Sequence, residues 1–160
     1  MTDDEQLFAV VFDLPAESDV WPPFATERLW TAKTGTKLHV RVRNTPFYIR
    51  GISYGDLILV RPDHERKELV FDRLVEESGH TTVRILVKEP RARDRIERLL
   101  TASDCSWEIS NTDNYFAVDV PPSVDYSLLR SKLLLLKDEG AIGLQEGAIS
   151  TSHRAQLPPS

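Results

Sequence analysis

The sequence predicts an α+β protein in which an N-terminal β-rich, partial-barrel unit packs on a C-terminal ferredoxin-like βαββαβ unit. The main observation is the order of elements expected over residues 81–150, which is the split βαβ pattern of a ferredoxin-like domain. A second observation is that residues 1–79 read as about five short strands joined by turns. A third is a composition of 41% hydrophobic and 28% charged residues over 160 positions, which is ordinary for a soluble globular protein.

Three segments follow from this interpretation: a β-rich unit over residues 1–79, a ferredoxin-like unit over residues 80–150 and a tail over residues 151–160. The tail contains two prolines and has no periodicity, so we expect it to be disordered. Residues 76–81 are too few for a flexible linker, so the two units are expected to form one body.

The first unit begins with the apolar strand 7–12, which is followed by a proline-containing loop over residues 15–26. A hairpin is expected next, because Gly35 supplies the backbone freedom for a turn between residues 27–32 and residues 37–43. Its second strand alternates Leu38, Val40 and Val42 with His39, Arg41 and Arg43, which is typical of a strand with one buried face. Two further strands are expected over residues 57–60 and 69–75.

The second unit begins with a strand over residues 81–87, and Pro90 then marks the start of a helix. The apolar residues of that helix lie on one face at helical spacing: Ala92, Ile96, Leu99 and Leu100. A hairpin over residues 107–110 and 115–120 follows. A second helix is expected to begin after Ser123 or Asp125 as N-cap and to end at Gly140, before a last strand over residues 142–149.

The composition argues against several functions. A formal net charge of −5 is the wrong sign for a general nucleic-acid binder, so no nucleic-acid partner is expected. The single cysteine, Cys105, excludes an intramolecular disulfide and a cysteine zinc site, and it favours a reducing compartment. The N-terminus is acidic where a signal peptide is basic, and the apolar run 7–12 is too short to span a bilayer. We therefore expect a cytoplasmic protein without a membrane partner.

Three segments resemble one bacterial family, domain of unknown function 4265. They are the run from Asn44 to Asp56, with Asn-Thr-Pro-Phe and Gly-Ile-Ser-Tyr-Gly-Asp, the run Ser78–Arg84 and the run Tyr115–Pro122. They occur in the expected order, and the resemblance extends over roughly residues 7–150. The resemblance implies a bacterial source and a small stand-alone protein, and it brings no activity or catalytic residue.

Candidate catalytic and ligand sites are few. The run from Gly51 to Gly55 matches G-x-S-x-G, but a strand rather than a helix is expected after it, so the match is interpreted as a turn. We expect a ligand cleft between the two units near Tyr54, Asp56 and His80, or a small enzyme that uses His80 with Asp56 or Asp72. The alternative for His80 is a purely structural role, a hydrogen bond to the backbone at the junction of the two units. The scattered histidines indicate no metal site, and no cofactor is expected.

Two basic rows and a leucine pair are candidate partner-binding residues. The rows are His39, Arg41, Arg43 and Arg50 in the first unit and Arg91, Arg95 and Arg98 on the first helix. The alternative is a solvated face on which nearby acids such as Asp94 and Glu97 pair with the arginines. Leu128 and Leu135 lie away from the buried stripe of the second helix, so they either pack on the β-rich unit or meet a partner or a second copy.

The function expected from these observations is a non-catalytic cytoplasmic protein-binding module with a protein partner or as a homodimer. A toxin-neutralising immunity protein is one such role, because an acidic protein can cover a basic active site and associate quickly with it. A small-molecule sensor with the inter-unit cleft and a small enzyme are the alternatives.

Overall fold

The computed structural model describes residues 5–159 and shows a mixed α+β protein. The chain divides into two compact units, Met1–Ser78 and Gly79–Ser160. Each unit has its own hydrophobic core, as each has its own sheet.

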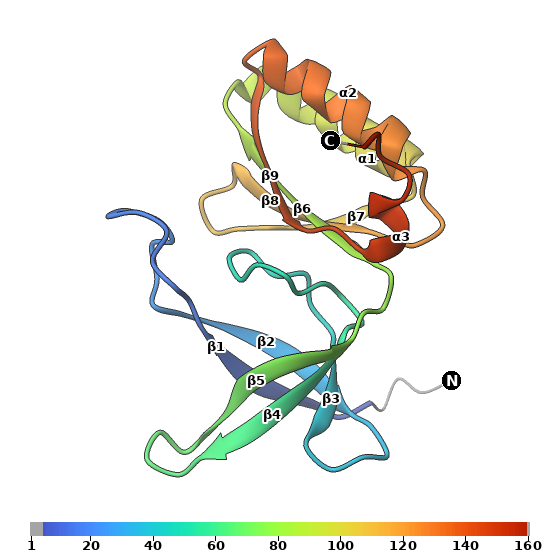
Figure 1. Ribbon diagram of the computed structural model, residues 1–160. Helices are drawn as coiled ribbons and strands as arrows, with labels where there is room; N and C mark the ends of the chain where they lie inside the picture. The colour runs from blue at the N-terminus through green and yellow to red at the C-terminus, as the bar shows by residue number, and fades with distance from the viewer. Residues whose placement is uncertain (1–4, 160) are drawn as a thin grey trace. The chain divides into compact units, whose positions relative to one another are not determined.

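The first unit is a closed barrel of five strands in sequence order (Figure 1). The strands are β1 (Leu7–Asp13), β2 (Thr26–Lys33), β3 (His39–Val42), β4 (Leu57–Asp63) and β5 (Glu68–Glu76). Neighbouring strands pair antiparallel from β1 to β5, and a parallel pairing of Val11 with Val70 closes the ring. The sequence predicted a partial barrel, and this pairing of the first strand with the last completes it.

The barrel interior follows from the alternation in its strands. In β3, Val40 and Val42 are buried in the core while His39 and Arg41 alternate with them and stay partly exposed, as the sequence predicted. Phe12 of β1 stacks on Phe71 of β5, with ring centroids 4.7 Å apart. Burial of such side chains is the main favourable contribution to folding of this small unit.

The second unit is a four-stranded antiparallel sheet in the order β7-β8-β6-β9, with helices on one of its faces (Figure 1). Its elements are β6 (Thr81–Val87), the 3₁₀ helix η1 (Pro90–Ala92), α1 (Arg93–Ala102), β7 (Ser106–Ile109), β8 (Tyr115–Val120), α2 (Tyr126–Asp138), β9 (Ile142–Ala148) and α3 (Thr151–Arg154). Helices α1 and α2 cover the sheet, and their apolar residues form one core with those of the strands.

Local signals explain where α2 begins and ends. Asp125 is the N-cap, and its side chain accepts a hydrogen bond from the amide of Leu128 at 3.0 Å. Gly140 follows the helix with a φ of 80°, a left-handed conformation in which glycine carries no Cβ penalty. The buried face of α2 comprises Tyr126, Leu129, Leu133 and Leu136.

The expectation of a disordered tail is wrong for its first part. Residues 151–154 form α3, capped by Ser150, whose hydroxyl accepts from the amide of His153 at 3.2 Å. His153 is fully buried, and Leu157 packs against the core of the second unit. A single helical turn followed by prolines has no hydrophobic periodicity, so this ordered segment leaves little trace in the sequence.

Within residues 5–159, none of the helices combines the length and the apolar character needed to cross a bilayer.

Candidate functional site

Asp56 stabilises the connection that leads into β4. Its carboxylate accepts hydrogen bonds from the amides of Ser53 and Ser78, each at 2.9 Å. The side chain is 3% exposed, and this burial raises the pKa of its carboxyl above the ordinary value. Tyr54 lies in the same turn, where its carbonyl accepts from the hydroxyl of Ser78 at 2.6 Å. These bonds give both predicted ligand residues a structural role within the first unit.

The G-x-S-x-G match does not form a nucleophile elbow. Ser53 is 1% exposed and is followed by strand β4, whereas the elbow requires an exposed serine before a helix. Gly51 and Gly55 both have φ of 82°, which explains why glycine occupies these turn positions. The expected interpretation as a turn is therefore confirmed.

His80 belongs to the second unit, just before β6, and its partner is Asp119 of β8. The His80 Nδ1 atom lies 2.7 Å from Asp119 Oδ1, and the two side chains are 20% and 11% exposed. Burial raises the pKa of the Asp119 carboxyl, while the bond to His80 opposes that shift. The sequence proposed Asp56 or Asp72 as its acid. The structure places the carboxylate of Asp119 beside His80, because β8 pairs with β6 and sets Asp119 opposite Thr82 at the start of that strand.

A second histidine, His153, lies in a buried polar cluster that the sequence did not indicate. Its Nδ1 atom is 2.7 Å from the hydroxyl of Thr81, which in turn accepts from the amide of Ser150 at 3.0 Å. The ring lies beside Tyr126, with centroids 5.4 Å apart. Burial is the main cause that lowers the pKa of His153, so the ring is held neutral. The cluster anchors α3 to the start of β6.

The first basic row is mostly engaged in bonds within the first unit. Arg43 pairs with Glu5 at 3.0 Å, which raises the pKa of the arginine, and Arg50 pairs with Glu17 at 2.7 Å. Arg41 donates to the carbonyl of Gly55 at 3.2 Å. His39 Nδ1 lies 3.1 Å from the carbonyl of Lys37. His39 and Arg41 lie on β3, and Arg43 directly follows it. Arg50 belongs to a later segment and pairs with Glu17 in the β1–β2 connection.

The second basic row follows α1 and its lead-in. Arg91 lies 3.6 Å from Glu89, Arg95 pairs with Glu139 at 2.9 Å, and Arg98 donates to the carbonyl of Asp94 at 3.3 Å. Arg91 and Arg95 therefore pair with nearby acids, as the alternative interpretation expected. The acids are Glu89 and Glu139, whereas the sequence analysis named Asp94 and Glu97 as examples.

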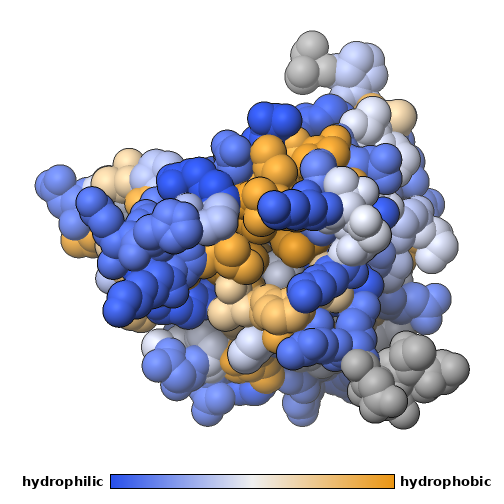
Figure 2. All heavy atoms as spheres, turned by 90° about the horizontal axis from the view of Figure 1, so that it is seen from below, coloured by the Kyte–Doolittle hydropathy of each residue, from blue (hydrophilic) through white to orange (hydrophobic). Residues whose placement is uncertain are grey.

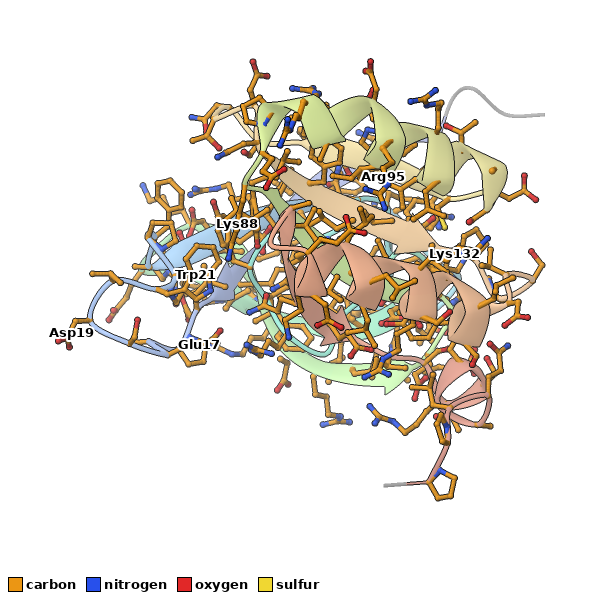
Figure 3. All side chains as sticks on the ribbon, turned by 90° about the horizontal axis from the view of Figure 1, so that it is seen from above. Glu17, Asp19, Trp21, Lys88, Arg95 and Lys132 are labelled. Carbon is orange, nitrogen blue, oxygen red and sulfur yellow. The ribbon has the colours of Figure 1, made fainter. Side chains whose placement is uncertain are left out.

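A groove between α1 and α2 brings cations and leucines together. Its volume is about 380 Å³, and its lining comprises Arg95, Arg98, Leu99, Lys132, Leu135 and Leu136. Figure 3 shows the two helices from above, with Arg95 on α1 and Lys132 on α2. On the same helix as Lys132, Leu128 is 53% exposed and Leu135 is 61% exposed. We call this surface, defined by the groove residues and Leu128, the α1–α2 face.

A pocket at one end of the barrel is the hollow that sequence analysis missed. Its volume is about 430 Å³, and residues of β1 to β5 and of the β2–β3 connection line it. The β2–β3 connection lies at the bottom of Figure 1. Figure 2 views the molecule from below and shows hydrophobic residues gathered in the middle of the face, with hydrophilic residues around them. The only sequence signal would have been Lys33 and Lys37 on either side of Gly35 in a hairpin turn.

For residues 5–159, no group of three or more His, Cys, Asp or Glu side chains is placed to hold a metal ion. The one cysteine, Cys105, is buried, and burial raises the pKa of its thiol to about 12. Such a thiol stays protonated and is a poor nucleophile and ligand.

Comparison with known proteins gives a shared fold and a family. Over 94% of this chain and 99% of the other, the structure matches a solved hypothetical protein from Neisseria gonorrhoeae, with a TM-score of 0.74 and 22% sequence identity. That likeness shows a shared fold. The chain belongs to the family described as Domain of unknown function (DUF4265), which matches residues 27–144. None of the curated proteins matches the chain.

Proposed function

We propose that this chain is a non-catalytic, cytoplasmic protein-binding module whose α1–α2 face binds an acidic, partly apolar segment of another protein. The observation that carries the proposal is the exposure of Leu128 and Leu135, at 53% and 61%, beside a groove whose charged lining residues are all basic. Large exposed apolar side chains rimmed by polar ones mark interaction sites.

The geometry of the face favours this partner. Leu128 and Leu135 are seven residues apart on α2, so they lie on one side of the helix, about two turns apart. Arg95, Arg98 and Lys132 supply positive charge next to them, and Glu139 reduces it at one end through its pair with Arg95. Leucines give the apolar contact area, while the cations favour a carboxylate-rich partner and speed its association.

The groups that suggested catalysis have structural bonds, which favours a binding role. Asp56 accepts from two backbone amides, and Asp119 holds His80. The enzyme with His80 and Asp56 or Asp72 therefore gains no support, while the cleft between the units near Tyr54, Asp56 and His80 stays a prediction.

A toxin-neutralising immunity protein remains a narrower form of the proposal. In that form the toxin would contact the α1–α2 face with an acidic and apolar surface. This differs from the basic toxin that the net charge of −5 by itself suggests. For the compartment, the single buried thiol of Cys105 suits the reducing cytoplasm.

We also propose that the second unit is a ferredoxin-like domain. The element order β6-α1-β7-β8-α2-β9 and the strand order β9-β6-β8-β7 support this assignment. The superfold hosts many activities, so the assignment itself brings no function.

A capture experiment with matched variants tests the proposed function. The tagged protein and its Leu128→Asp/Leu135→Asp variant are incubated with lysate of the source bacterium, with Val75→Asp as control because Val75 is 42% exposed in the first unit. We expect one stoichiometric acidic partner with the wild type and the control, and its loss with the double variant. Equal capture by all three proteins, or capture of nothing, would contradict the proposal. So would a homodimer that the double variant disrupts, since the occupant would then be a second copy.

A further inference from the structure

We propose that the pocket at the end of the barrel binds a small amphipathic carboxylate, with its apolar body inside the barrel mouth and its carboxylate at Lys33 and Lys37. This site lies wholly in the first unit, so it is independent of the α1–α2 face.

The floor of the pocket is apolar. It is formed by side chains from four strands and the β2–β3 connection: Phe8, Leu38, Val40, Val60 and Leu69. Val40 and Val60 are core residues, 6% and 1% exposed, so the hollow reaches the barrel interior. A volume of about 430 Å³ is within the range of small-molecule sites. The floor therefore fits an alkyl or aryl group.

The rim is positively charged. Lys33 and Lys37 line it together with His39, and none of the lining residues is acidic. Neither lysine is in a salt bridge with another of the residues 5–159. The Nζ atom of Lys33 lies 4.9 Å from the centre of the Phe8 ring, which holds the ammonium at the boundary between rim and floor.

This combination selects a carboxylate with an apolar body. Two ammonium groups beside a largely apolar hollow attract an anion by charge. A carboxylate bound at the rim beside these lysines stays partly hydrated, whereas burying a more highly charged group against the apolar floor would cost more desolvation free energy.

The rim is ordered before a ligand arrives. The hydroxyl of Thr34 donates to the carbonyl of His39 at 2.8 Å and accepts from the amide of Thr36 at 3.1 Å. Leu38 has a φ of 64°, an unusual conformation for leucine, and its side chain packs against the barrel core. A rim fixed in this way loses little conformational entropy when it binds.

The test is a ¹H–¹⁵N NMR titration of the full chain with octanoate and with 4-phenylbutyrate, each compared with its neutral amide. We expect saturable shifts of the Gly35, Thr36 and Leu38 amides with at least one acid. We also expect its amide to bind about fivefold more weakly, since loss of the exposed ion pairs at the rim corresponds to about that factor.

Substitution of the two lysines tests whether the positive charge at the rim binds the carboxylate. The Lys33→Gln/Lys37→Gln protein should bind the same acid about fivefold more weakly or worse, whereas Lys137→Gln on α2 should bind it as the wild type does. The proposal is overturned by an absence of saturable shifts with both acids, by equal binding of acid and amide, or by unchanged binding in the double variant.

Discussion

The buried cluster around His153 gives a quantitative prediction for the second unit. The substitution His153→Ala removes a fully buried ring and its contact with the Thr81 hydroxyl at 2.7 Å. The lost hydrogen bond costs about 1 kcal/mol, and the cavity left beside Tyr126 brings the total to about 3 kcal/mol. With an m value near 1.5 kcal/mol/M in urea, the midpoint should fall by about 2 M.

The assay must report the second unit alone. Trp107 packs against the core of that unit, so its fluorescence follows unfolding when Trp21 and Trp30 of the first unit are replaced by Phe. Arg154→Ala is the matched control, because Arg154 is the exposed neighbour on α3 and its loss should change stability by less than about 0.5 kcal/mol. Equal midpoints for His153→Ala and the control would refute the buried position of the ring.

The same residue predicts how stability depends on pH. Burial is the main cause that lowers the pKa of His153 below its ordinary 6.5, and hydrogen bonding to nearby backbone groups opposes that shift. As the pH falls below 6.5, this histidine binds a proton in the unfolded chain but not in the folded protein. The contribution of His153 to the free energy of unfolding is therefore fully present above that pH. It decreases below that pH by at most about 1.4 kcal/mol per pH unit.

His153→Phe keeps a ring without the titrating group, so it isolates this effect. The raised pKa of Asp119 has the opposite sign, favouring the folded state in acid, and it is common to both proteins. Between pH 7.5 and pH 5.5 the wild type should therefore lose more stability than His153→Phe does. Parallel profiles would show that the ring is not held neutral.

Three further outcomes are expected. Asp56→Ala should destabilise the first unit by about 3 kcal/mol, because two buried amides lose their acceptor. Asp72→Ala should leave the free energy of unfolding nearly unchanged, because Asp72 is exposed. Urea unfolding followed by the fluorescence of Trp30 measures both variants. Asp125→Ala should cost the second unit about 1 kcal/mol in the same type of assay, because it removes the N-cap of α2. Cys105 should react with a thiol reagent at pH 8 only when the protein unfolds, because burial raises the pKa of its thiol to about 12. Fast labelling of the native protein would contradict this prediction.

Local patterns predicted the second unit well. The stripe that includes Ile96 and Leu100 predicted α1, and both side chains are fully buried. Asp125 was one of the two N-caps expected for α2, and Gly140 ends it as expected. These signals lie within one or two helical turns, so a single sequence is enough to identify them.

The features that the sequence did not predict depend on contacts between distant residues. Closure of the barrel requires Val11 to meet Val70, and the partner of His80 is Asp119, 39 residues away. Neither pairing leaves a periodic signal. The barrel pocket was missed for the same reason, since Phe8 and Leu69 come together only when the strands close.

The most direct test of the α1–α2 face is site-specific photo-crosslinking in cells of the source organism. A photoreactive amino acid replaces Ser131, which is exposed on α2 between Leu128 and Leu135, and a control protein carries it at the exposed Asp72 of β5. We predict one crosslinked protein from position 131, with an acidic segment at the crosslink, and none of it from position 72. The same product from both positions, or none from position 131, would contradict a partner at this face.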